Sequence, residues 1–254
     1  MELEVTPAFP TLIGRLQIPD AGAMNQDLEA LILAEEAKYS SLGRSNIGGW
    51  HSRPDFLSWR DPAVAALTSW LNWTLRGMIQ ASAGSNQLKG TVSVSAWATL
   101  CRAGAYHAPH SHPDSAWSGV YYVDPGSSNP DQPLSGILEF VDPRAGVEAV
   151  TAPGDPYGEP VRVRPQAGLL VIFPSWLYHW VHPYVGQTPR IAVSFNATLA
   201  PVAEEVILPA RGVRHHCTDV AARACDLETA RCPNAIPLQF TQRETCYVDS
   251  SFIR

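Results

Sequence analysis

The stretch "HAPHSHPDSAWSGVYYV", residues 107–123, places three histidines and an aspartate within eight positions, directly before a run with strand character. Residues two apart on a strand point to the same side. His110 and His112 could therefore present two imidazoles to one point, and so could His112 together with Asp114. A hydrated turn is the competing interpretation, because Pro113 is a common turn residue. The rest of the chain has to decide between a metal site and a turn.

The sequence around this stretch has the texture of an antiparallel β protein. Short apolar or alternating runs are separated by Pro, Gly, Asp and Ser. This pattern indicates a sandwich or barrel rather than parallel β-α-β units. The predicted strands are "TVSVSAWATL" (91–100), "WSGVYYV" (117–123), "GILEFV" (136–141), "PVRVRP" (160–165), "GLLVIF" (168–173), "LYHWVHP" (177–183) and "RIAVSFNATL" (190–199).

Two helices are predicted before the strands. In residues 24–40, apolar side chains recur at helical spacing and glutamates occupy the remaining positions. The second helix is predicted over 62–83. Asp61 can cap its free N–H groups, Pro62 suits the first helical position, and Gly84 can end it.

These elements predict one domain over residues 1–200, whose β core spans about 89–200. Residues 201–254 have weak periodicity and form an extension of unknown role. A zinc site in this extension is a minor interpretation, because no C-x2-C pair exists, and a loosely packed extension is favoured. The residues that would supply zinc ligands are Cys217, Cys225, Cys232, Cys246, His215 and His216.

The bulk composition excludes several classes of protein. A net charge of -6 without runs of Lys or Arg argues against nucleic acid as a partner. No apolar run approaches the roughly 18 residues of a membrane span, and the first residues do not have the pattern of a signal peptide. Five cysteines without a signal peptide predict reduced thiols and a cytoplasmic location. A homodimer is compatible with the sequence.

Two features far along the chain favour the metal site. His179 follows the apolar run "GLLVIFPS", which could bring a third imidazole back to the same end of a barrel. Arg190 opens the apolar strand "RIAVSFN", and a buried guanidinium needs an anion such as a carboxylate. Ala192 and Ser194 share its strand face and leave room beside it. Three protein ligands with open positions are what a non-haem iron site needs.

Four segments taken together make the chain resemble the 2-oxoglutarate- and Fe(II)-dependent oxygenase superfamily, in detail a bacterial and phage branch of it. They are "PHSHPDSAWSGVYYV", "GILEFVDPR", "GLLVIFPSWLYHWVHPY" and "RIAVSFN", and "GGWHSRPDF" (48–56) resembles the N-terminal signature of that branch. The resemblance covers about residues 8–200. It implies a mainly β fold with flanking α-helices, a cupin-like jelly roll called the double-stranded β-helix. It also implies Fe(II) and 2-oxoglutarate as cofactors and a dioxygenase that hydroxylates a small molecule or a protein with O2.

The resemblance implies a role for five residues by position. His110, His112 and His179 would be the metal ligands. Arg190 would hold the far carboxylate of 2-oxoglutarate, and Tyr122 matches a tyrosine that often helps to hold it.

The sequence departs from the family's ordinary His-x-Asp pair. His112 followed by Pro and Asp114 would restore a carboxylate ligand, with Asp114 in place of His110. The Pro-His context and the short gap to the next strand favour His110 with His112, whereas neutralisation of the Fe(II) charge favours Asp114. His107 and His182 are expected to lie at the rim or behind the ligands.

Two other functions remain open at this point. One is a catalytically inactive cupin-like binding protein, and the other is a three-histidine dioxygenase that does not use 2-oxoglutarate. An Arg190 paired with a protein carboxylate would favour the latter. Aromatic residues that could line the mouth of the site, or equally belong to the core or rim, are Trp50, His51, Trp117 and Trp176.

Overall fold

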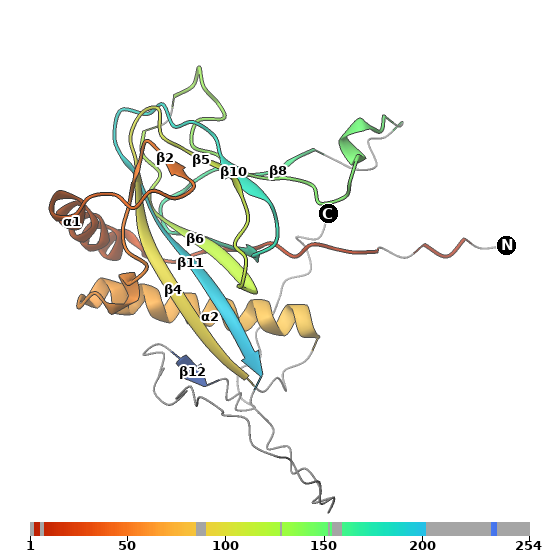
Figure 1. The fold of residues 1–254 in the computed structure, drawn as a ribbon, viewed down its shortest axis with the longest axis horizontal. Helices are drawn as coiled ribbons and strands as arrows, with labels where there is room; N and C mark the ends of the chain where they lie inside the picture. The colour runs from red at the N-terminus through yellow and green to blue at the C-terminus, as the bar shows by residue number, and fades with distance from the viewer. Residues whose placement is uncertain are drawn as a thin grey trace, which may run out of the picture.

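The protein has three layers: two helices, a 7-stranded sheet and a 5-stranded sheet (Figure 1). The computed structural model describes residues 3–5, 8–84, 90–127, 129–151, 153, 159–201 and 235–237. The two long helices are α1 (Gly22–Lys38) and α2 (Pro62–Ala83), and short 3-10 turns occur at Phe56–Ser58 and Val147–Ala149. Within the described residues, neither α1 nor α2 combines the length and the apolar character needed to cross a membrane.

The larger sheet is antiparallel throughout its named strand pairs. Along the sheet its strands are β1 (Gly14–Gln17), β9 (Leu169–Pro174), β6 (Trp117–Asp124), β11 (Arg190–Pro201), β4 (Gly90–Cys101) and β12 (Ala235–Pro237), with β3 (Trp50–His51) also paired to β4. Helix α2 crosses one face of this sheet (Figure 1).

The smaller sheet lies on the other face and is also antiparallel. Its order is β2 (Asn46–Ile47), β5 (Tyr106–His110), β10 (His179–Val181), β7 (Leu138–Phe140) and β8 (Val161–Val163). In the ladder between β5 and β10, His179 is the direct partner of His110. The fold brings together two histidines that are far apart in sequence.

The alternation of side chains along the strands separates the core from the site. On β11, Ile191, Val193 and Phe195 belong to the apolar cluster shared with the two helices. Arg190 and Ser194, which lie on the opposite face of the strand, line a cavity between the sheets. Because successive strand residues point to opposite faces, one strand supports the core and the site at once.

Helix α2 has the boundaries that its sequence predicts. The Asp61 carboxylate accepts a hydrogen bond from the Ala63 N–H at 2.8 Å, Pro62 is the first helical residue, and Gly84 adopts a left-handed conformation with φ 62°. Helix α1 begins and ends two residues before the predicted range of 24–40.

The predicted double-stranded β-helix architecture with two N-terminal helices is confirmed. The two sheets are separate and do not close into a barrel. All seven predicted strands occur, whereas the short strands β1, β2, β3 and β12 and the histidine-containing β5 were not predicted. The domain boundary at residue 200 stays a prediction. The cysteines and histidines of the predicted extension lie outside the described residues.

Candidate active site

Three imidazoles converge at the end of the smaller sheet. The ligand atoms of His110, His112 and His179 all lie within 4.8 Å of one another. The ring of His110 is 4.4 Å from that of His179, and the ring of His112 is 5.2 Å from it. His110 ends β5 and His179 begins β10, so the ladder between these strands sets the shortest distance. The structure brings together the three histidines that the sequence analysis expected to converge, and their role as metal ligands stays a prediction.

Backbone carbonyls orient two of the rings. His110 Nδ1 lies 2.7 Å from the Ala108 carbonyl oxygen, and His179 Nδ1 lies 2.8 Å from that of Leu177. In each ring this contact places the proton on Nδ1 and leaves Nε2 with a free lone pair. The N–H of His112 donates to the Ser175 carbonyl at 2.9 Å, which fixes the backbone beyond β5. This arrangement fits the donor set of a divalent metal.

The cluster is in the protonation state that metal binding requires. Burial, with a smaller contribution from the neighbouring His110, lowers the pKa of His179 to about 3. Burial likewise lowers the pKa of His112 to about 4, and it also lowers the pKa of His110. The three imidazoles are therefore neutral near pH 7, and a neutral imidazole is the form that binds a metal.

A buried cation lies beside the imidazoles. Arg190 is 2% exposed, and its Nε has no hydrogen-bond partner. No carboxylate in the described part of the chain forms a salt bridge with it. Gly136 makes room for its stem, because a Cβ there would lie 3.3 Å from Arg190 Cδ. A buried unpaired guanidinium is costly, so this position is suited to an anionic ligand.

Tyr122 lies beside this guanidinium. The Arg190 guanidinium lies 5.1 Å from the centre of the Tyr122 ring, and the buried Tyr122 hydroxyl also has no hydrogen-bond partner. Burial raises the pKa of Tyr122, although the charge of Arg190 opposes the shift. The phenol therefore keeps its proton and can donate it to a carboxylate oxygen.

One cavity of about 460 Å³ contains both groups. It is lined by the three histidines, Arg190 and Tyr122, and by side chains of β4 and β11 that face away from the helices. Behind its wall, the Ser118 hydroxyl contacts the Ser175 hydroxyl at 2.7 Å and donates to Asn196 Oδ1 at 2.8 Å. These contacts connect β6 and β11 with Ser175, the residue that follows β9.

The remaining predicted histidines and the alternative ligand lie elsewhere. Asp114 is exposed, adopts a φ of 64°, and belongs neither to the cluster nor to the cavity lining. His107 lines the cavity behind His110, with Nε2 3.7 Å from Cys101 Sγ. His182 contacts Glu139 at 3.1 Å outside the lining.

The four candidate aromatic residues divide in the same way. His51 lines the cavity, while Trp50 and Trp117 are buried away from it and Trp176 is 58% exposed. The aromatic side chain that the sequence analysis missed is Trp97, which lies between the rings of His51 and His112. The alternation of β4 could have identified it, since Trp97 points to the face opposite the helix-facing core.

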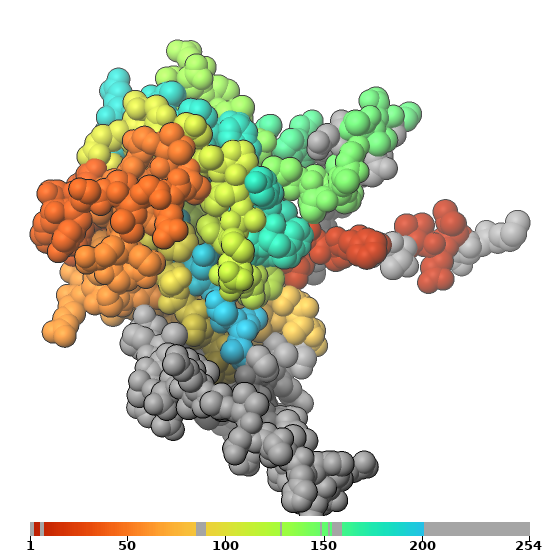
Figure 2. All heavy atoms as spheres, in the orientation of Figure 1, coloured from red at the N-terminus to blue at the C-terminus, as the bar shows by residue number. Residues whose placement is uncertain are grey.

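Ser45 is a second residue that the sequence analysis missed. Its hydroxyl lies 3.3 Å from His110 Nε2, the atom available to a metal. It comes from the irregular segment before β2, and Figure 2 shows the orange residues around 50 packed against yellow and yellow-green residues around 90–120. No local pattern in the sequence marks it.

Comparisons with known proteins agree with this geometry. Residues 95–196 match a family model described as "Putative 2OG-Fe(II) oxygenase". No curated protein matches the chain. The matched range contains all three histidines of the cluster together with Tyr122 and Arg190.

Solved structures share the fold at low sequence identity. A prolyl-4-hydroxylase of Pseudomonas putida is 17% identical, covers 75% of this chain and 93% of its own, and has a TM-score of 0.52. SnoN, a non-heme alpha ketoglutarate dependent epimerase from nogalamycin biosynthesis, is 14% identical over 93% of this chain and 95% of its own, with a TM-score of 0.55. HygX from Streptomyces hygroscopicus, solved with nickel and 2-oxoglutarate, is 9% identical, covers 76% of this chain and 84% of its own, and has a TM-score of 0.51. Over residues 95–196, the chain is therefore similar to the proteins described as putative 2OG-Fe(II) oxygenases, and the solved structures share its fold.

Proposed function

We propose that the protein is an Fe(II)- and 2-oxoglutarate-dependent dioxygenase that hydroxylates a small molecule or a protein. One observation carries this proposal. Three neutral imidazoles lie within 4.8 Å of one another, in the same cavity as a buried guanidinium that pairs with no protein carboxylate. Iron and 2-oxoglutarate, when bound, supply the oxidative chemistry with O2, and the protein supplies orientation and shelter.

His110, His112 and His179 are the proposed iron ligands. They would hold the metal by three protein ligands, and the cavity that they line would leave room for further ligands. Asp114 is not assigned, because its exposed position lies outside the cluster.

Arg190 and Tyr122 are the proposed binding residues for the far carboxylate of 2-oxoglutarate. Each has a buried polar atom without a partner, and a carboxylate would accept hydrogen bonds from both. Ala192 and Ser194 line the cavity beside Arg190 and leave the space that the cofactor needs.

The placement of Arg190 favours this function over a three-histidine dioxygenase that lacks 2-oxoglutarate. That alternative would leave the buried charge without a counter-ion in the described part of the chain. An inactive binding protein would keep the pocket but not the turnover. The expected cytoplasmic location and homodimer stay predictions.

An anaerobic titration separates the three functions. Fe(II) is added to the purified full chain with and without 2-oxoglutarate, and the metal-to-ligand charge-transfer absorption is recorded. We expect the band only with both components, and succinate formation on admission of O2. A band without any succinate would support the inactive binding protein, and iron binding without the band would support the alternative dioxygenase.

Two variants test the assignment of residues. His179→Ala should abolish the band, because it removes one of three ligands. His182→Gln is the matched control, since His182 is a histidine of the same strand region outside the cavity lining. Equal loss of the band in both variants would contradict the proposed ligand set.

A further inference from the structure

The outer wall of the cavity comes from a segment that the family match does not include. Leu42, Arg44, His51 and Pro54 line the cavity but precede the matched range of residues 95–196. A substrate bound in this cavity would lie against this wall as well as near the three histidines. The chemistry of the wall therefore bears on which substrate the proposed oxygenase accepts, and the inference below rests on that proposed function.

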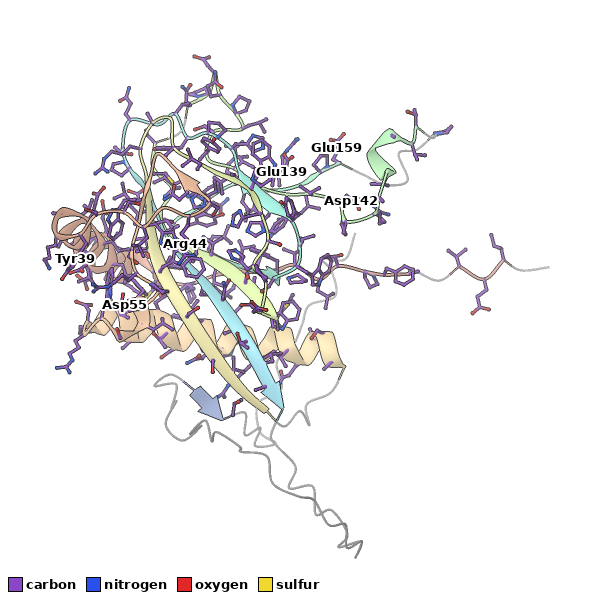
Figure 3. All side chains as sticks on the ribbon, in the orientation of Figure 1. Tyr39, Arg44, Asp55, Glu139, Asp142 and Glu159 are labelled. Carbon is purple, nitrogen blue, oxygen red and sulfur yellow. The ribbon has the colours of Figure 1, made fainter. Side chains whose placement is uncertain are left out.

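The described lining contains no acidic side chain. The protein has 24 Asp and Glu residues, yet none of those that the structure describes lines this cavity. The charged side chains of the lining are Arg44 and Arg190. Figure 3 shows Glu139 and Asp142 to the right of Arg44 in the view, over the other end of the smaller sheet.

Arg44 has a free guanidinium. It is exposed, and no ion pair or hydrogen bond joins it to any residue that the structure describes. Its charge lies near the buried His51, whose pKa is lowered by burial and further by Arg44. The next residue, Ser45, contacts His110 at 3.3 Å, which holds this part of the chain close to the three histidines.

The charge of the loaded cavity also favours an anion. Three neutral imidazoles leave the charge of a ferrous ion uncompensated, and the 2-oxoglutarate dianion would cancel it. Arg190 and Arg44 then leave the cavity positive, whereas an aspartate ligand would have reduced that charge. A positive cavity with low-dielectric walls attracts and retains an anionic substrate.

The walls next to Arg44 are apolar and partly flat. Trp97 stacks on His51 with ring centres 5.5 Å apart and planes 12° apart, and Leu42 and Pro54 also line the cavity. The cavity volume of about 460 Å³ is that of a small-molecule site, for which about 300–1,000 Å³ is usual, and iron and 2-oxoglutarate would occupy part of it. The space suits a small organic compound rather than a folded protein surface.

We propose that the substrate is a small organic anion. Its carboxylate or phosphate binds Arg44 at the mouth, and its apolar body lies along Trp97 toward the three histidines. Arg44 acts as a specificity-determining residue, while Arg190 is reserved for 2-oxoglutarate.

The test uses isosteric probes on the full chain loaded anaerobically with Fe(II) and saturating 2-oxoglutarate. Benzoate and phenyl phosphate are the anionic probes, and benzamide is the neutral one. Binding is followed by the fluorescence of the tryptophans, and retention of 2-oxoglutarate by its charge-transfer band. Arg44→Gln removes the charge at an exposed position, and Arg76→Gln on the exposed side of α2 is the matched control.

We expect an anionic probe to bind more tightly than benzamide, with the charge-transfer band retained. Arg44→Gln should weaken that binding about tenfold or more, as for loss of a charge-assisted hydrogen bond, and Arg76→Gln should not. Benzoate against phenyl phosphate identifies the preferred anion. Equal affinity for the neutral probe, an equal effect of Arg76→Gln, or displacement of 2-oxoglutarate would overturn the proposal. If the charge-transfer band itself never forms, the proposed function has failed instead.

Discussion

Replacing Arg190 with methionine should have opposite effects on the metal-free protein and on cofactor binding. Methionine keeps much of the stem length but lacks the charge. In the metal-free protein the variant removes a buried guanidinium whose Nε is unpaired, which relieves about 1–3 kcal/mol. It also loses the contact with the Tyr122 ring, worth about 0.5–2 kcal/mol. The net change is about -1 to +2.5 kcal/mol, so the metal-free variant should unfold at nearly the same temperature or a few degrees higher.

Cofactor binding should respond in the other direction. Removing one partner of a buried, hydrogen-bonded charge pair costs about 2–5 kcal/mol, which is roughly 30- to 4,000-fold in Kd. Titration of 2-oxoglutarate into the Fe(II)-loaded protein under anaerobic conditions measures this loss. Thermal unfolding without metal measures the first effect, and Arg76→Met on the exposed side of α2 controls for loss of a positive charge. A destabilised metal-free variant that binds 2-oxoglutarate as well as the parent protein would refute the reasoning, because Arg190 would then be a structural cation.

Three further predictions test the site and the fold. His112→Ala should weaken metal binding more than the loss of a residue that only hydrogen-bonds to a ligand, which costs about 10- to 100-fold. Asp114→Ala should leave metal binding unchanged, and a calorimetric titration with Mn²⁺ measures both variants. The reverse result would make Asp114 the ligand instead. Burial alone would raise the pKa of Glu139, but hydrogen bonds, chiefly the one from Arg162, lower this pKa overall. The pair therefore stabilises the fold above the ordinary pKa of 4.5. This contribution is lost as the pH falls through the lowered pKa. Glu139→Gln should thus lower the free energy of unfolding by about 1 kcal/mol at neutral pH and by nothing in acid, and a difference in urea unfolding that does not depend on pH would contradict this. Asp61→Ala should cost about 1 kcal/mol through loss of the α2 cap, and an unchanged urea midpoint would show that the cap contributes nothing.

The parts of the fold with strong local signals were predictable from the sequence. Helix α2 has a cap, a proline and a terminal glycine, and the long strands β4 and β11 alternate over their whole length. Strands β2 and β3 contain two residues each, too few for any periodicity to appear. Strand β5 carries Pro109 and two histidines, which read as a turn, and its pairing with distant β10 makes it a strand.

The residues of the site also differ in how well the sequence predicts them. The three histidines and Arg190 belong to sequence motifs that follow one another in a recognisable order. Their convergence follows from the strand pairing that those motifs imply. Arg44 and Ser45 lie in an irregular segment whose path over the cavity depends on tertiary contacts such as the hydrogen bond from the Ala108 N–H to the Ser45 carbonyl. No local rule places such a segment.

The alternation along β11 makes the site sensitive to length rather than to composition. Deleting one residue near the start of this strand would exchange the two faces, and Ile191 would take the place of Arg190 while a charge entered the helix-packed interior. Substitutions at Leu42 and Arg44 carry no such penalty, since these two side chains are exposed and line the cavity. Changes at Leu42 and Arg44 could therefore alter which compounds the protein accepts while leaving the three histidines and Arg190 in place.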